Sequence, residues 1–204
     1  MNVALACRCG RISGVARDVS PGTSNYVVCH CDDCQAFAHF LACDGVLDVH
    51  AGTPIVQLAP AQIKIETGAD ELQCVRLSAR GLFRWHAGCC RTPIGNTVSA
   101  RVPLVGVIHS FLRLDESGPS RDELFGPAAL IHGRFAPGGC PSHVAPSVPV
   151  AVIVRMIARL ATWWITGQGT PSPFFDTAGH PRSHPRILSA AERERLAAPT
   201  ESSA

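Results

Sequence analysis

Short segments in which apolar and polar residues alternate fill the first half of the chain. The clearest runs from Gln62 to Thr67, and a second, from Leu72 to Leu77, follows a turn at Gly68. Alternation with a period of two residues is typical of strands that bury one face. Further strands are expected at residues 12–19, 26–28, 55–58, 82–85 and 104–108. The pattern predicts a mainly β fold in which antiparallel strands follow one another along the chain.

A helical period replaces this alternation from Val150 to Thr166. The polar residues form one stripe, at i, i+4, i+7 and i+11: Arg155, Arg159, Thr162 and Thr166. The other positions make a broad apolar surface, which a soluble monomer seldom exposes. We therefore expect this helix to pack on the β domain or in a homodimer. Pro149 and the two arginines keep the apolar run well below the roughly 20 residues that span a bilayer, so no transmembrane segment is expected.

Three regions follow from these patterns. A β domain is expected at residues 1–111, an irregular connection rich in Gly, Pro and Ser at 112–148, and a helical extension at 149–204. A last short helix is expected after Ser189, because serine is a favourable N-cap and Glu192 stands three residues further on. The extension is thus expected to hold two helices.

The composition favours a globular protein whose cysteines bind metal. Hydrophobic residues make up 46% of the 204 residues and charged residues 17%, which is enough apolar sequence for a packed core. The net charge of +2 comes without a block of Lys or Arg, so no nucleic-acid partner is expected.

Seven of the ten cysteines form tight groups whose neighbouring thiols rarely pair as disulfides. Metal binding in a reducing compartment explains them better, and because residues 1–6 form no secretory signal we expect a cytoplasmic protein.

The most informative motif is Cys29-His30-Cys31-Asp32-Asp33-Cys34, which directly follows a predicted strand. Three thiols at this spacing can reach one metal ion, and a soft divalent ion such as zinc takes four ligands in a tetrahedron. Cys29, Cys31 and Cys34 would leave the fourth position for another residue, a water or a substrate. This open position makes the three cysteines candidates for a catalytic site.

Two further cysteine clusters lie on either side of the motif. The first is Cys7-Arg8-Cys9-Gly10, and the second is Trp85-His86-Ala87-Gly88-Cys89-Cys90, which follows a predicted strand. In this order the three motifs resemble the zinc motifs of the glutathione-dependent formaldehyde-activating enzyme and centromere protein V family. The resemblance extends over residues 3–111, about half of the chain.

The resemblance implies a fold, two metal ions and a class of activity. The fold would be a β-rich Mss4-like fold of stacked sheets. Cys7 and Cys9 would share a structural zinc with the last cluster, while Cys29, Cys31 and Cys34 would hold a catalytic zinc. The activity would be that of a carbon–sulfur lyase on a thiol adduct of a small aldehyde, such as glutathione with formaldehyde.

The last cluster departs from the family pattern, in which it reads C-x-x-C-G. His86 stands at the first cysteine, Cys89 matches the second, and Cys90 replaces the glycine. A site of Cys7, Cys9, His86 and Cys89 is chemically sound because imidazole is a good zinc ligand. Alternatively, His86 is an aromatic-like strand residue and Cys90 supplies a thiolate to one of the zinc ions. Spacing does not distinguish these two possibilities.

The charge of a three-thiolate site bears on its chemistry. A divalent ion with three thiolates carries one net negative charge, which makes it a weak Lewis acid but a good partner for a substrate sulfur. The leading hypothesis is a zinc-dependent, carbon–sulfur lyase-like enzyme, and the alternative is a non-catalytic zinc-binding structural or interaction module. An open fourth position beside a cleft favours the enzyme, and a buried site closed by Cys90 favours the module. Arg84 and Arg91 are candidates to bind the carboxylates of a glutathione-like substrate, or else are solvated surface residues.

Overall fold

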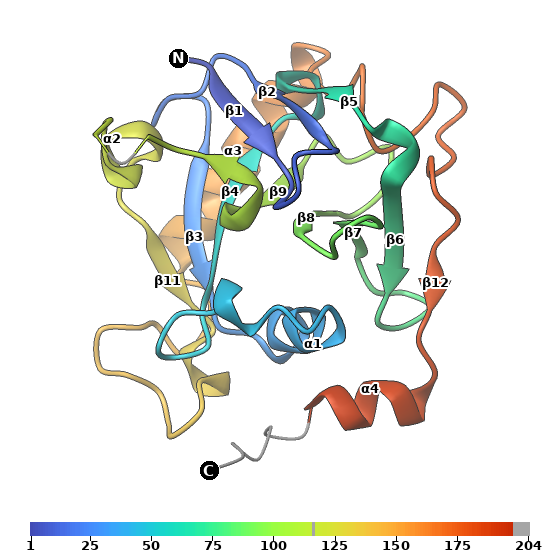
Figure 1. The fold of residues 1–204 in the computed structure, drawn as a ribbon. Helices are drawn as coiled ribbons and strands as arrows, with labels where there is room; N and C mark the ends of the chain where they lie inside the picture. Colours follow the sequence, from blue (N-terminus) through green and yellow to red (C-terminus); the bar gives the residue numbers. More distant parts are fainter. Residues whose placement is uncertain (116, 198–204) are drawn as a thin grey trace.

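Two β-sheets share one buried core in the computed structural model, which describes residues 1–115 and 117–197 (Figure 1). The smaller sheet has the strand order β10 (Leu112–Arg113), β1 (Val3–Ala6), β2 (Ser13–Ala16), β5 (Ile63–Thr67). The larger sheet has the order β11 (Ala129–Ile131), β3 (Asn25–Cys29), β4 (Thr53–Leu58), β9 (Val105–Ile108), β8 (Pro93–Thr97), β7 (Phe83–Ala87), β6 (Leu72–Arg76), β12 (Arg186–Ile187). The expected mainly β fold is confirmed.

The larger sheet is mixed, because both of its edge strands are parallel to their neighbours. β11 pairs with β3, placing Ile131 opposite Cys29, and β12 pairs with β6. The inner strands are antiparallel, as expected. A tight hairpin forces antiparallel pairing, whereas a strand that returns after a long connection can pair in either direction. The antiparallel prediction is therefore wrong at the two edges.

Each face of the larger sheet covers a separate apolar core. Between the sheets lie Leu5, Val56 and Trp85, all at most 1% exposed. On the opposite face the helix α1 (Asp32–Phe40) packs Phe37 against residues such as Ile108. Burial on both faces gives the inner strands the nearly continuous apolar character of β3 and β9.

The C-terminal half of the chain takes part in both cores. Phe174 is fully buried and Phe175 nearly so, with ring centroids 5.0 and 5.8 Å from that of Trp85. The segment expected to be an irregular connection contributes β10, the short helix α2 (Arg121–Phe125) and β11. The shorter turns include the 3-10 helices η1 (Asp44–Val46), η2 (Pro60–Gln62), η3 (Ala69–Glu71), η4 (His109–Phe111) and η5 (Gly133–Phe135). The three regions expected from the sequence thus contribute strands to the same two sheets and residues to the same two cores.

The helix α3 (Val150–Ile165) forms where the period predicted it and lies behind β3 and β4 in the view of Figure 1, with Met156 Sδ 4.0 Å from Gln57 Nε2 of β4. Arg159 anchors it by donating to the carbonyl oxygens of Pro21 and Ser24, each at 3.3 Å. Trp163 is buried, but Trp164 remains 74% exposed. The described residues 1–115 and 117–197 therefore leave most of the apolar surface of the helix uncovered, and the homodimer stays a prediction. None of the helices in the described part of the chain combines the length and the apolar character that crossing a bilayer requires.

The last helix, α4 (Ala190–Ala197), begins with the expected cap and packs against α1. Ser189 Oγ accepts a hydrogen bond from the Glu192 amide at 3.2 Å, and the Ser189 amide donates to Glu192 Oε2 at 2.9 Å.

We predict that Ser189→Ala lowers the free energy of unfolding by about 1 kcal/mol, because it removes this capping box. Urea unfolding of the full chain measures the change. Ser147→Ala, at an exposed position, is the matched control and should change stability by less than about 0.5 kcal/mol; equal effects of the two substitutions would contradict the capping role.

Candidate metal centres

Four thiols from two loops meet at the margin of the core between the sheets. Cys7 and Cys9 follow β1, while Cys89 and Cys90 follow β7, and their sulfur atoms all lie within 4.8 Å of one another. The Sγ–Sγ distances are 3.5 Å for Cys7–Cys9, 3.3 Å for Cys9–Cys89, and 3.8 Å for both Cys7–Cys89 and Cys89–Cys90. A tetrahedral zinc site with Zn–S bonds of about 2.3 Å needs sulfur atoms about 3.8 Å apart. These four cysteines, called the four-thiol group below, therefore fit a soft divalent ion.

Hydrogen bonds within and between the two loops hold the four-thiol group in place. The Ile12 amide donates to Cys7 Sγ at 3.3 Å, and the Arg8 amide donates to Thr92 Oγ1 at 2.9 Å. Cys90 Sγ lies 3.1 Å from the same hydroxyl group. Burial raises the pKa of the Cys90 thiol, but hydrogen bonds from Thr92 and Cys9 outweigh this and lower it to about 6. Cys90 is thus favoured as a thiolate, the form that binds metal.

His86 lies outside the four-thiol group. Its ring packs edge-on against those of Phe37 and Phe40, with centroids 6.4 and 6.1 Å away. Burial lowers the pKa of His86 to about 4, so the ring is neutral. A register shift between Trp85 and His86 accompanies this orientation, in which Trp85 packs into the core between the sheets and His86 contacts α1. Of the two alternatives left open by spacing, the geometry brings Cys90 to the other thiols and gives His86 the aromatic-like position.

The second group comprises Cys29, Cys31 and Cys34, and is called the three-thiol group. Cys29 ends β3, Cys31 is the N-cap of α1, and Cys34 lies in the first turn of that helix. Their sulfur atoms also lie within 4.8 Å of one another. The sequence pattern had not indicated a helix that begins at Asp32. The signal that was missed is the acidic pair Asp32 and Asp33, which is typical of a first helical turn.

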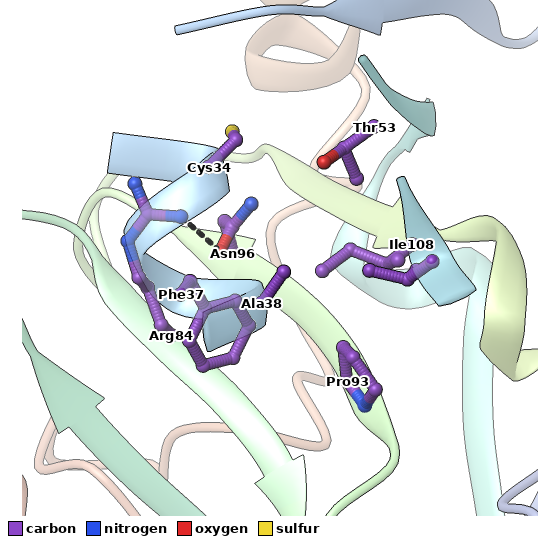
Figure 2. A pocket seen from close by; sticks show the side chains of 9 residues that line it. Cys34, Phe37, Ala38, Thr53, Arg84, Pro93, Asn96 and Ile108 are labelled. Atoms are coloured by element: carbon purple, nitrogen blue, oxygen red, sulfur yellow. Dashed lines mark hydrogen bonds between the residues drawn. The ribbon is translucent and has the colours of Figure 1, made fainter. Parts of the chain in front are cut away.

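A buried arginine lies behind the three-thiol group. Arg84, on β7, is 2% exposed, and its guanidinium group contacts Asp33 Oδ2 at 3.5 Å and donates to Asn96 Oδ1 at 3.3 Å. Figure 2 shows Arg84 alongside Phe37, with its guanidinium group at the end of α1 that carries Cys34. Hydrogen bonds from the Cys29 and Cys31 thiols hold the pKa of Cys34 well below its usual value, and the charge of Arg84 lowers it further. Arg84 therefore stabilises a thiolate, and the expectation of a solvated surface residue is wrong.

Arg91 and His30 do not take part in the three-thiol group as Arg84 does. Arg91 is exposed, and its guanidinium group donates to the Phe40 carbonyl oxygen, away from the three thiols. The buried His30 fixes the loop instead, because its Nδ1 lies 3.1 Å from the Ile131 carbonyl oxygen. Gly52 allows this packing, since a Cβ atom there would lie 2.6 Å from both His30 Nε2 and Asp48 Oδ2. The loop that carries the three thiols is thus held by the contact of His30 with Ile131 and by close packing at Gly52.

The three-thiol group opens onto a cavity of about 260 Å³, called the thiol cavity. Its polar lining residues are Asp33, Gln57, Arg84, Asn96, Thr97 and His132. Its apolar lining residues include Val27, Ile55, Leu82, Val98, Leu104 and Ile131. On the other side of Cys34, the space drawn in Figure 2 is a void of only about 10 Å³, which admits at most about one water molecule. A ligand therefore reaches the thiols from the thiol cavity.

His132 is the lining residue that the sequence did not indicate. It follows β11 with a left-handed backbone (φ 62°), and parallel pairing of β11 with β3 brings it beside the three thiols. Burial lowers its pKa, and its Nδ1 atom is buried without a hydrogen-bond partner among the described residues. Nothing in the spacing of His132 from Cys29, about one hundred residues away, could have predicted this placement.

Comparison with known proteins identifies a family and no activity. The model of a family of unknown function, DUF6151, matches residues 1–184. This range includes both thiol groups and every residue of the thiol cavity. No curated protein matches the chain.

Proposed function

We propose that this chain, which belongs to the DUF6151 family of unknown function, is a zinc enzyme that forms or breaks the carbon–sulfur bond of a thiol adduct of a small aldehyde. The observation that supports this most is the position of the three-thiol group. It contributes three sulfur ligands and borders the thiol cavity, whereas Cys90 belongs to the four-thiol group. The resemblance of the three cysteine motifs to the formaldehyde-activating and centromere protein V family, with its Mss4-like fold, is part of the same proposal.

The two groups would hold metal ions with different roles. Cys7, Cys9, Cys89 and Cys90 supply four thiolates and would close a structural site, while Cys29, Cys31 and Cys34 supply three. A zinc ion held by three thiolates supplies a soft binding position for the sulfur of a substrate thiol. Free thiols persist in a reducing compartment, so the proposal includes a cytoplasmic location.

The protein's own groups prepare the site for this reaction. Arg84 offsets the negative charge of the three thiolates, and it is fixed by Asp33 and Asn96. The thiol cavity gives a substrate access to the three thiols. In the forward direction the thiol sulfur bonds to the aldehyde carbon, the carbon–oxygen double bond becomes single, and the thiol proton moves to the oxygen. The reverse reaction returns thiol and aldehyde, so no oxidant or reductant is needed.

Exchange NMR of a small thiol with formaldehyde, in the presence of zinc-loaded protein, tests the proposal. We expect wild-type protein to accelerate adduct exchange and Cys31→Ser to return it to the uncatalysed rate, because a hydroxyl group is a much weaker zinc ligand than a thiolate. The variant should keep its circular dichroism spectrum, since Cys31 is only partly buried at a helix N-cap. An unchanged exchange rate with wild-type protein would overturn the proposal and favour the non-catalytic zinc module.

A further inference from the structure

We propose that the thiol cavity selects small uncharged thiols and excludes thiols that carry carboxylates, glutathione included. This inference rests on the proposed function, because it assumes that the substrate sulfur binds at the three-thiol group. It narrows the substrate to a short, neutral thiol or its adduct with a small aldehyde. The inference follows from the charge, the walls and the size of the cavity.

The charges at the thiol cavity do not favour an anion. Among the described residues that line it, Arg84 is the one with a permanent positive charge. The side chain of Arg84 is 2% exposed and its guanidinium group already contacts Asp33 and Asn96, which limits its availability to a substrate carboxylate. Asp33 itself lines the cavity with a side chain that is 35% exposed. The carboxylate of Asp33 also lies 3.6 Å from Arg193 of α4, which does not line the cavity.

Metal binding would not add a free cationic side chain to the cavity. A divalent ion with three thiolates leaves one net negative charge, which the single charge of Arg84 offsets. The Asp33 carboxylate at the wall is in turn offset by Arg193, so no cation among the described residues is left unpaired there. A substrate carboxylate would lose hydration without gaining a free cationic partner.

The walls and volume of the thiol cavity point to the same class of ligand. The partly exposed residues of the lining include the apolar Leu82, Val98 and Leu104. A carboxylate placed against them would be desolvated by hydrocarbon. The cavity measures about 260 Å³, which is below the roughly 300–1,000 Å³ of typical small-molecule sites. The volume therefore favours a ligand smaller than a tripeptide thiol.

Isothermal titration of the zinc-loaded full chain with two thiols of nearly equal size tests the inference. The probes are mercaptopropionamide and mercaptopropionate, which differ in one negative charge. We expect the amide to bind at least about tenfold more tightly than the acid, because only the acid places a carboxylate in the cavity. Glutathione should bind no better than the acid.

Val98→Lys supplies the cation that the lining lacks at a position that is 44% exposed. We expect it to strengthen binding of the acid at least about fivefold and to leave binding of the amide unchanged. The matched control is Val49→Lys, at a 95% exposed position outside the cavity, which should change neither affinity.

The outcomes separate this inference from the proposed function. Equal or tighter binding of the acid or of glutathione to wild-type protein would overturn the selectivity and leave the proposed function standing. Absence of binding by all three thiols would overturn both. An equal gain in acid binding by Val98→Lys and Val49→Lys would assign the effect to overall charge and would contradict the role given to the cavity wall.

Discussion

Replacement of both Cys7 and Cys9 by serine should leave most of the protein unfolded and lower the proposed zinc content from two ions to one. Structural zinc sites contribute about 10–16 kcal/mol of apparent binding free energy, whereas a whole domain is stable by about 5–15 kcal/mol. The four-thiol group joins the loop after β1 to the loop after β7, so it links the smaller sheet to the larger. Loss of its metal therefore removes a connection between the two sheets. Elemental analysis and circular dichroism of the purified variant measure the two effects.

Two single substitutions serve as comparisons for this double variant. Cys31→Ser should destabilise the fold less, because the three-thiol group lies beside an open cavity and joins adjacent segments of the chain. Cys140→Ser, at an exposed thiol outside both groups, should change stability by less than about 0.5 kcal/mol. A wild-type protein that purifies without metal and is nevertheless fully folded would refute the structural role of the four-thiol group.

Arg84→Met should lower the free energy of unfolding by about 3 kcal/mol, since removal of one partner from a buried ion pair typically costs about 3–5 kcal/mol. The lower end applies because Asp33 is 35% exposed and retains some hydration. Methionine preserves much of the side-chain volume, so the change reports mainly on charge. The same substitution should weaken zinc binding by the three-thiol group, since the thiolates lose their compensating cation. Urea unfolding and competition with a chelator measure the two effects.

The control for Arg84→Met is Arg80→Met, at an exposed position, which should leave stability and zinc affinity nearly unchanged. Zinc at the four-thiol group should also keep its affinity in Arg84→Met, because Arg84 does not contact that group. If Arg84→Met retains wild-type stability and wild-type affinity at both groups, the guanidinium group has no part in holding the three thiolates.

The local pattern of apolar and polar residues was sufficient to predict several strands and helices. Strands β5 and β6, the helix α3 and the capped start of α4 occur where alternation, helical period and Ser189 predicted them. The three-thiol group could also be predicted from neighbouring residues, because Cys29, Cys31 and Cys34 lie within six residues. The end of a strand followed by the start of a helix keeps them together. These features depend on neighbours within a few residues, which the sequence displays directly.

Tertiary structure decided how the distant residues combine. The side chain of His86 lies on the face of β7 that α1 covers, and the turn after β7 brings Cys90 to Cys7 and Cys9. Parallel pairing of β11 brings His132 to the thiol cavity. The burial of Arg84 likewise follows from α1 covering the sheet at that point. The physical reason is that a strand side chain points to either face according to register, and strand pairing over long connections sets both register and neighbours, which spacing along the chain does not record.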